Sequence, residues 1–211
     1  MTATRLPRMI DRSQSRSWKT GSGAATFSVM STDITPSAVV AFWKEAGPSK
    51  WFAKDDAFDA EFRRRFHDAH VAAARRELDP WAETPEGVLA LMILLDQFPR
   101  NSFRNTGHAF ATDPLARMFA LKALDAGFDR MLENDLRRFL YLPLQHAEDM
   151  ALQDRQLALF QTMERPDDDR WAEHHHAVIA RFGRFPHRNR ALGRETTAEE
   201  RAFLEADGFR G

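Results

Sequence analysis

Apolar residues recur at helical spacing along most of the chain that follows Met30. Phe58, Phe62 and Phe66 stand four residues apart, and residues 88–95 (VLALMILL) are apolar on every side. Spacing of three to four residues places side chains on one face of an α-helix, whereas a half-buried strand needs strict alternation. No segment alternates convincingly, and tyrosine and the β-branched residues that strands favour are scarce. The pattern predicts an all-α protein.

Helix start and stop signals divide this pattern into about seven or eight helices. Thr35 suits the N-cap of the first helix, Pro36 its first position and Gly47 the residue just past its end. The later helices are predicted between Asp55 and Pro80, from Pro85 to about Gln97, from Asp113 to Gly127, from Asn134 to Tyr141, after Pro143, from Asp168 or Asp169 to Gly183, and after a capping box of Thr196 and Glu199. Consecutive helices of this kind are expected to pack as helical hairpins.

The length and composition favour one folded domain behind a basic leader. The chain has 211 residues, of which 43% are apolar, and this is enough for one sizeable core. Residues 1–29 carry several arginines and serines, one acid and no apolar stretch. We expect residues 1–29 to be a disordered leader, or a segment upstream of the true start, and residues 30–211 to be a single α-helical domain. No fixed 34-residue period is present, so a regular tetratricopeptide array is not expected.

Charge and cysteine content narrow the classes of function. The formal net charge is −1, which gives no general attraction for nucleic acid. The chain has no cysteine, so thiol chemistry and Cys-ligated zinc are excluded. Its longest strongly apolar run, residues 88–95, is far shorter than the roughly 20 residues that a membrane span needs. These features predict a cytoplasmic protein with no nucleic-acid or membrane partner, and they indicate no metal or other cofactor.

The apolar helix over residues 88–95 leads into a polar segment, Asp96, Gln97, Phe98, Pro99, Arg100 and Asn101. A carboxylate at a helix C-terminus meets the negative end of the helix dipole, and burial adds to the cost. Asp96 therefore needs a cation, which Arg100, Arg104 or the arginines near Pro186 are expected to supply. Either the result is an internal ion pair that joins two helix ends, or Asp96 positions an arginine that holds a ligand.

Two histidines are candidates for acid–base chemistry. His146 and Asp149 are expected on one face of the sixth helix, three residues apart. They would serve as two metal ligands only if a third ligand joined them, and the simpler alternative is a hydrogen bond between neighbours. His175 falls on the apolar stripe of the seventh helix, which leads directly into an arginine-rich turn.

That turn, within the segment RFGRFPHRNRALGR, holds five arginines between residues 181 and 194. Gly183 is expected to end a helix in the left-handed conformation, and Pro186 stiffens the bend. The following polar residues stand near the N-terminus of the last helix, where free N–H groups favour an anion. The expected anion-binding donors are Arg184, His187, Arg188, Asn189 and Arg194. Their competing use is to satisfy Asp96, Asp149 and Glu195 internally.

Four blocks resemble the signature of the domain of unknown function 924 family, which is bacterial and uncharacterised. They are LLDQFPRNSFR, FATDPLA, YLPLQHAED and FGRFPHRNRALGRETTAEERAFL. The likeness spans about residues 34 to 205 and implies an all-α fold of TPR-like helical hairpins, with no known activity. The family pattern falls here on Asp96, Gln97, Arg100, Asn101, Tyr141, His146, Glu148, His175, Arg184, His187, Arg188, Asn189 and Arg194. Ala147 stands where the family usually has serine, so a hydroxyl has no role at that position.

These observations leave three functional interpretations. The first is a binding module, in which the polar residues at the two Phe-Pro turns hold a small anionic molecule or the acidic end of a peptide. The second is a hydrolase of the phosphatase or esterase kind, with His146 or His175 as general base, oriented by Asp149 or Asp96, and arginines that stabilise the transition state. The third is a buried network that only fixes helix packing. The oligomeric state is left open.

Overall fold

The computed structural model describes residues 34–163 and 166–207, which belong to one compact unit. The described residues contain helices and no strand, so the all-α prediction is confirmed. The α-helices are α1 (Pro36–Ala46), α2 (Pro48–Trp51), α3 (Asp56–Ala74), α4 (Pro85–Met92), α5 (Phe98–Ser102), α6 (Asp113–Asp125), α7 (Asn134–Gln145), α8 (Met150–Phe160), α9 (Pro166–Phe182) and α10 (Ala198–Asp207). Single 3-10 turns are η1 (Asp79–Glu83), η3 (Gly107–Phe110), η4 (Phe128–Met131) and η5 (Pro186–Arg188), and η2 (Ile93–Gln97) is a π-helical turn. The leader expected over residues 1–29 lies outside the described residues.

The first helix forms as its sequence predicts. The Thr35 hydroxyl accepts a hydrogen bond from the Ala38 amide at 3.2 Å, Pro36 opens α1, and Gly47 follows it with a φ of 72°. Trp43 is fully buried, and its ring lies 5.5 Å from that of Phe62 on α3. The amphipathic faces of α1 and α3 therefore meet in an aromatic layer.

The helix α4 with its continuation η2 is the buried centre of the fold. Every residue from 88 to 95 is at most 1% exposed, as its continuous apolar sequence predicts. It packs against α1, α6 and α7. Because this element is fixed on all sides, the polar residues at its end, beginning with Asp96, are held in a rigid frame.

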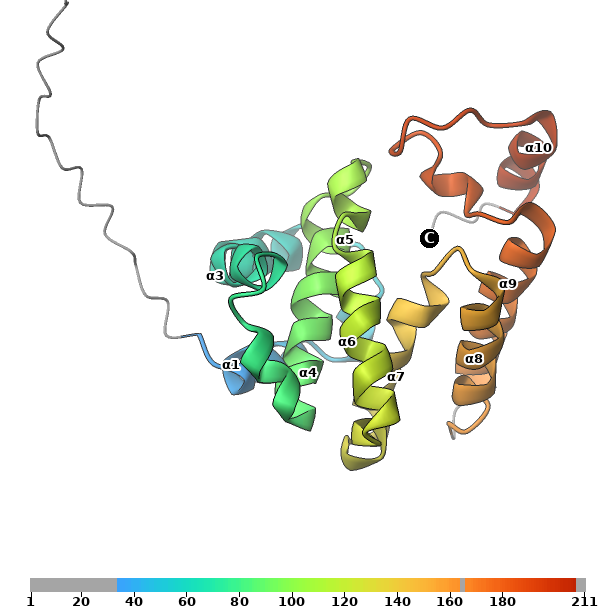
Figure 1. The fold of residues 1–211 in the computed structure, drawn as a ribbon. Coiled ribbons are helices and arrows are strands. Elements are labelled where there is room, and N and C mark those ends of the chain that lie inside the picture. Colours follow the sequence, from blue (N-terminus) through green and yellow to red (C-terminus); the bar gives the residue numbers. More distant parts are fainter. Residues whose placement is uncertain (1–33, 164–165, 208–211) are drawn as a thin grey trace, which may run out of the picture. The chain divides into compact units, whose positions relative to one another are not determined.

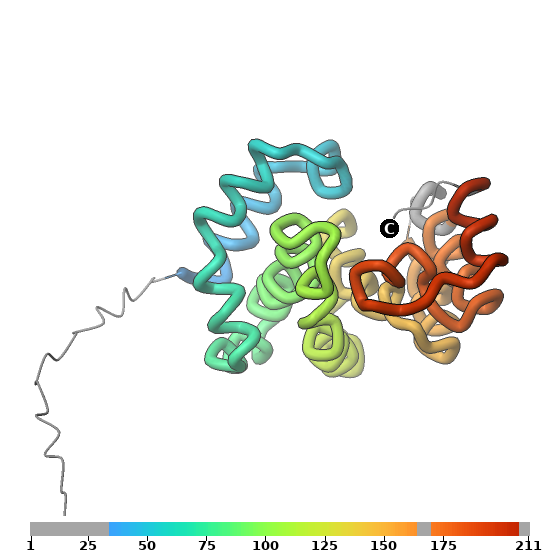
Figure 2. The backbone as a smooth tube through the Cα atoms, turned by 90° about the horizontal axis from the view of Figure 1, so that it is seen from above, coloured from blue at the N-terminus to red at the C-terminus, as the bar shows by residue number. Residues whose placement is uncertain are grey.

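Consecutive helices from α6 to α9 pack against one another (Figures 1 and 2). The fully buried Gln153 of α8 donates to the carbonyls of Gln145 and Ala147, each at 2.8 Å, and so satisfies carbonyl groups at the end of α7. Gln156 donates in the same way to Ala172 of α9 at 3.0 Å. These packed pairs agree with the expected helical hairpins, while the TPR-like classification stays a prediction.

Five predicted helix boundaries were wrong. The third predicted helix does not end near Gln97 but continues through η2 into α5. Helix α7 runs through Pro143 to Gln145 instead of stopping at Tyr141, so the sixth predicted helix begins at Met150 and not directly after Pro143. The seventh predicted helix begins at Pro166, ahead of Asp168 and Asp169. The final capping box lies one residue later than expected: Thr197 Oγ1 accepts from the Glu200 amide at 3.1 Å, and Glu200 accepts from the Thr197 amide at 2.8 Å. None of the described helices is both long and apolar enough to cross a membrane.

Candidate functional site

The π-helical turn η2 brings Asp96 to its position. The Phe98 amide donates to the Ile93 carbonyl, five residues back, so the helix makes one wider turn before Pro99. Pro99 has no N–H, so it cannot donate to the carbonyl of Leu95 four residues earlier. Single π-turns of this kind occur often at functional sites. Here the turn keeps the helix continuous across a proline that was expected to end it.

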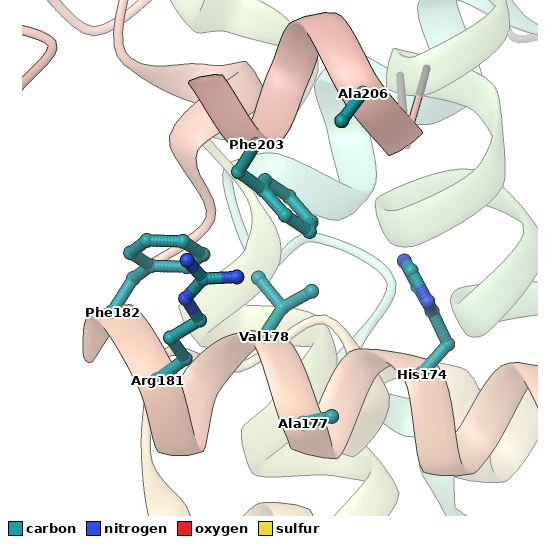
Figure 3. Close-up of a pocket in the computed structure, with 7 residues that line it drawn as sticks. All are labelled: His174, Ala177, Val178, Arg181, Phe182, Phe203 and Ala206. Carbon is teal, nitrogen blue, oxygen red and sulfur yellow. The ribbon is translucent and has the colours of Figure 1, made fainter. Parts of the chain in front are cut away.

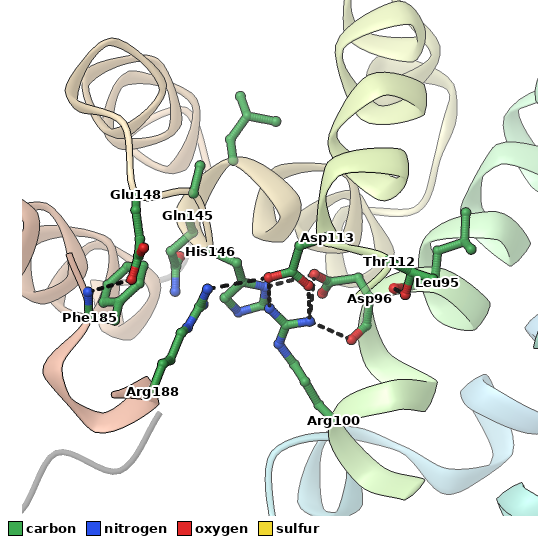
Figure 4. A network of polar contacts seen from close by, with 12 residues as sticks. Leu95, Asp96, Arg100, Thr112, Asp113, Gln145, His146, Glu148, Phe185 and Arg188 are labelled. Atoms are coloured by element: carbon green, nitrogen blue, oxygen red, sulfur yellow. Dashed lines mark hydrogen bonds and ion pairs between the residues drawn. The ribbon is translucent and has the colours of Figure 1, made fainter. Parts of the chain in front are cut away.

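Side chains from other elements satisfy the carbonyl groups that the π-turn leaves free. The Leu94 carbonyl accepts from His70 Nδ1 of α3 at 2.9 Å. The Leu95 carbonyl accepts from the Thr112 hydroxyl at 2.5 Å, a contact drawn in Figure 4. The Asp96 carbonyl accepts from Arg100 at 2.8 Å. A buried backbone group without a partner costs about 1–3 kcal/mol, so these contacts stabilise the irregular turn by satisfying its carbonyl groups.

The Asp96 carboxylate, 1% exposed, orients His146. His146 Nδ1 lies 2.8 Å from Asp96 Oδ1, and Gln97 donates to Oδ2 at 2.6 Å. Arg100 Nη1 lies 3.0 Å from Oδ1. Because a carboxylate accepts and does not donate, His146 carries its proton on Nδ1 and presents an acceptor at Nε2. Among the described residues, Nε2 has no hydrogen-bond partner.

Asp113 joins the two Phe-Pro turns. Arg100, from the first turn, donates to both of its carboxylate oxygens at 2.8 and 3.0 Å, and Arg188, from the second turn, donates to Oδ2 at 3.3 Å. Figure 4 shows both arginines approaching Asp113 beside His146. We call Asp96, Arg100, Asp113, His146 and Arg188 the inner cluster. The expected meeting of the two turns therefore occurs, through a carboxylate on α6 that sequence analysis treated only as a helix start.

Arg188 is buried yet loosely paired. It is 6% exposed, and its guanidinium lies 4.6 Å from the centre of the Phe110 ring and 4.5 Å from that of Phe185. The bond to Asp113 is the one hydrogen bond of its guanidinium among the described residues, and Nε is buried without a partner. The Nε and Nη2 donors of a guanidinium form one edge that can bind two oxygens of a carboxylate or phosphate. In Arg188 this edge has no carboxylate on it among the described residues.

The electrostatic state of the inner cluster follows from burial and charge. Burial alone would raise the pKa of Asp96, but Arg100, His146 and Gln97 outweigh it and lower that pKa to about 2. Burial, followed by the charge of Arg100, lowers the pKa of His146, while Asp96 opposes the shift. Burial also lowers the pKa of Arg188 to about 10, with Arg100 contributing. At neutral pH Asp96 is therefore a carboxylate, Arg100 and Arg188 are charged guanidiniums, and His146 is a neutral imidazole.

Two further histidines flank the inner cluster. The His175 ring lies 6.2 Å from that of His146, and its Nδ1 lies 2.8 Å from the Trp171 carbonyl and 3.2 Å from Gln145 Nε2. Burial, then the nearby His146, lowers the pKa of His175 to about 3. Burial, then Arg188, lowers that of His187 to about 3. Both histidines are neutral at pH 7. His175 is oriented by the Trp171 carbonyl of its own helix, and not by Asp149 or Asp96, which were the predicted partners.

Two other arginines of the second turn, Arg184 and Arg194, form ion pairs. Arg184 binds both oxygens of Glu200 at 2.6 and 2.9 Å. Arg194 binds both oxygens of Glu148 at 2.7 and 2.9 Å, and Glu148 also accepts from the Phe185 amide at 2.8 Å. We call Arg184–Glu200 and Arg194–Glu148 the loop pairs. They attach α10 and the α7–α8 connection to the turn.

Three predicted site residues lie outside the inner cluster, where their side chains hold helices or helix ends in place. Asn189 is fully buried and donates to Glu200 at 3.2 Å. Asn101 donates to Asp59 of α3 at 2.7 Å, where Arg104 also binds. Asp149 is the N-cap of α8 and accepts from the Leu152 amide at 3.1 Å, whereas His146 ends α7. The expectation that His146 and Asp149 share one helix face was therefore wrong, because the chain turns between them.

Four residues that make contacts in or beside the site were not predicted to do so from their own positions in the sequence. Asp113 and Thr112 stand in the FATDPLA block, and Phe110 of that block packs on Arg188. Glu148, which only the family pattern had pointed to, binds Arg194, 46 residues further on. The block itself was the only available signal for Asp113. Within the described residues, no three side chains of the types that bind metals lie together as a metal site.

The fold and site together define a class: an all-α protein with a buried cluster of arginine, carboxylate and histidine side chains between its helices. The chain belongs to the DUF924 family of bacterial proteins of unknown function, whose family model matches residues 39–208. It is similar to the solved structure of a protein of unknown function, ATU0120, from Agrobacterium tumefaciens. The two share 58% sequence identity with a TM-score of 0.79, over 81% of this chain and 96% of that one. The search of curated proteins returned no match.

Proposed function

We propose that the inner cluster binds a small molecule through a phosphate or carboxylate group, and that Arg188 is the main donor. The observation that carries this proposal is the buried bidentate edge of Arg188, which has no carboxylate on it among the described residues. On the same turn, Arg184 uses its Nε and Nη2 donors to hold both oxygens of Glu200 at 2.6 and 2.9 Å. In Arg188 the Nε donor is buried without a partner. A buried arginine that lacks a carboxylate on this edge is suited to an oxyanion.

The neighbours of Arg188 favour a ligand that both accepts and donates hydrogen bonds. His146 presents an acceptor at Nε2, because its Nδ1 proton is held by Asp96 at 2.8 Å. A protonated phosphate group, or an acid with an adjacent hydroxyl, would accept from Arg188 and donate to His146. Arg100 already binds both oxygens of Asp113, at 2.8 and 3.0 Å. Asp113 therefore does not form a bidentate pair with Arg188, which reaches only its Oδ2 atom.

Titration calorimetry with inorganic phosphate tests this proposal. The wild-type protein should bind, and Arg188→Met should lose at least about tenfold in affinity, since a charge-assisted bidentate contact is removed. Arg190→Met is the matched control, because Arg190 is an exposed arginine on the same turn. If the two variants lost affinity equally, the effect would be one of overall charge and Arg188 would not be the binding residue.

A second candidate function is hydrolysis, favoured by the geometry of Asp96 and His146. A buried carboxylate that orients a neutral histidine is the arrangement of a general base, and arginine side chains stand beside it to stabilise developing negative charge. Ala147 supplies no hydroxyl next to His146, so water would be the nucleophile. His146→Gln should abolish turnover of p-nitrophenyl phosphate or p-nitrophenyl acetate, whereas His176→Gln, a change at a histidine paired with the exposed Asp154, should not. Wild-type protein with no turnover of either substrate would remove this candidate.

We also propose a cytoplasmic location. The chain has no cysteine, and disulfides stabilise many secreted proteins. The proposed function requires neither a metal nor another cofactor.

A further inference from the structure

A groove lies between α9 and α10 and shares no residue with the inner cluster. This groove has a volume of about 420 Å³. Ala177, Val178 and Phe182 of α9 and Phe203 and Ala206 of α10 form its apolar walls (Figure 3). Small-ligand sites typically measure about 300–1,000 Å³ and are lined mainly by apolar and aromatic side chains with a few polar groups. In size and lining, the α9–α10 groove fits that description.

The groove has one cationic end. Figure 3 shows Arg181 at one end of it and His174 at the other. The Arg181 guanidinium lies 4.7 Å from the centre of the Phe182 ring and 5.8 Å from that of Phe203, so its charge stands directly over the apolar wall. An anionic group at this end would be complementary in charge, and an apolar body would lie along Val178 and Phe203.

The present partner of Arg181 can be exchanged. Arg181 donates to Glu199 at 2.9 Å, but the side chains are 53% and 63% exposed, respectively. Exposed ion pairs of this kind contribute about 0–1 kcal/mol. A ligand carboxylate can therefore replace Glu199 at little cost. By contrast, Glu200 next to it is 2% exposed and fixes α10 through Arg184, so the walls of the groove keep their positions.

We propose that the α9–α10 groove binds a small monocarboxylic acid with an aromatic or branched alkyl body. The apolar part lies between Val178 and Phe203, and the carboxylate pairs with Arg181. This site is separate from the oxyanion site proposed for the inner cluster, and it selects for an apolar body that inorganic phosphate lacks.

Titration calorimetry with 4-phenylbutyrate as the probe tests the site, with 4-phenylbutyramide as its uncharged counterpart. Ala177→Leu adds bulk inside the groove and should weaken 4-phenylbutyrate binding at least about tenfold, because the added carbon atoms occupy the space of the ligand. Ala180→Leu makes the same change at an exposed position of α9 that does not line the groove, and its affinity should equal that of the wild type.

Charge recognition is tested by Arg181→Gln. This variant should bind 4-phenylbutyrate about two- to fivefold more weakly and 4-phenylbutyramide as well as the wild type does, as expected for one exposed ion pair. Saturating inorganic phosphate, the ligand proposed for the inner cluster, should leave 4-phenylbutyrate binding unchanged, which separates the two sites. No binding to the wild type at millimolar probe, equal binding by Ala177→Leu and Ala180→Leu, or loss of 4-phenylbutyrate binding in saturating phosphate would each overturn the proposal.

Discussion

The inner cluster and the loop pairs use the same residue types on the same turn, yet they differ in how completely the arginines are paired. In the loop pairs each arginine binds both oxygens of its own glutamate at 2.6–2.9 Å. In the inner cluster two arginines share Asp113, and Arg188 holds it at 3.3 Å. A bidentate pair of this kind fastens two elements together, whereas an under-paired buried arginine has capacity left for a ligand. Among the arginines of the predicted anion site, Arg188 and Arg194 each keep an Nε without a partner, but Arg194 holds both oxygens of Glu148 through its Nη atoms, whereas Arg188 holds a single carboxylate oxygen.

The largest expected effect is that of removing the shared carboxylate. Asp113→Asn removes the carboxylate that Arg100 and Arg188 share, so that Arg100 keeps only Asp96 and buried Arg188 loses its ion pair. This change should lower the free energy of unfolding by about 3–5 kcal/mol. Urea denaturation measures the change. Asp154→Asn is the control, since Asp154 is 68% exposed, and it should lie within about 0.5 kcal/mol of the wild type. A loss below about 1 kcal/mol for Asp113→Asn would mean that the ion pairs of Asp113 with Arg100 and Arg188 do not stabilise the fold.

The next effect is a loss of stability in acid. The pKa values of His175 and His187 are lowered to about 3, so the unfolded chain, with histidine pKa values near 6.5, binds more protons as the pH falls. Each should contribute about 2 kcal/mol of destabilisation between pH 7 and pH 5. Denaturation across this range should show a shallower fall for His175→Gln than for the wild type. Equal slopes in the two proteins would contradict the burial of a neutral His175.

A smaller effect is expected from one loop pair. Arg194→Met leaves Glu148 with the Phe185 amide as its remaining hydrogen-bond donor among the described residues. The stranded carboxylate should cost about 1–2 kcal/mol of unfolding free energy, moderated by its 25% exposure. The same change at exposed Arg190 should cost almost nothing. If both variants behaved alike, the pair would not fasten the turn.

The turn also depends on one backbone conformation. Gly183 has a φ of 66° after the last residue of α9. A side chain there meets no atom within 4 Å, so Gly183→Ala should cost about 1 kcal/mol through backbone strain alone. Thermal denaturation should detect this decrease without any change in phosphate binding. A larger loss together with lost binding would show that Gly183 also sets the position of Arg188.

The sequence predicted most of the local structure and only part of the site. Cap residues such as Thr35 and Gly47 locate helix ends because their signals are local. The need of Asp96 for a cation followed from its place after a buried helix. The π-turn was missed because Pro99 normally ends a helix, and only tertiary contacts from His70 and Thr112 allow the helix to continue. The choice between Glu148 and Glu200 as arginine partners depends on distances across the fold that no local pattern contains.

The most direct test of the account is the stability of Arg188→Met, measured by urea denaturation with and without phosphate. Asp113 keeps both bonds to Arg100 in this variant, so no charge is stranded, and a buried ion pair can be replaced by an apolar side chain at little cost. We predict an unfolding free energy within about 1 kcal/mol of the wild type and complete loss of the stabilisation by phosphate. A loss of several kcal/mol, with phosphate having no effect on either protein, would show instead that Arg188 serves only to hold the fold together.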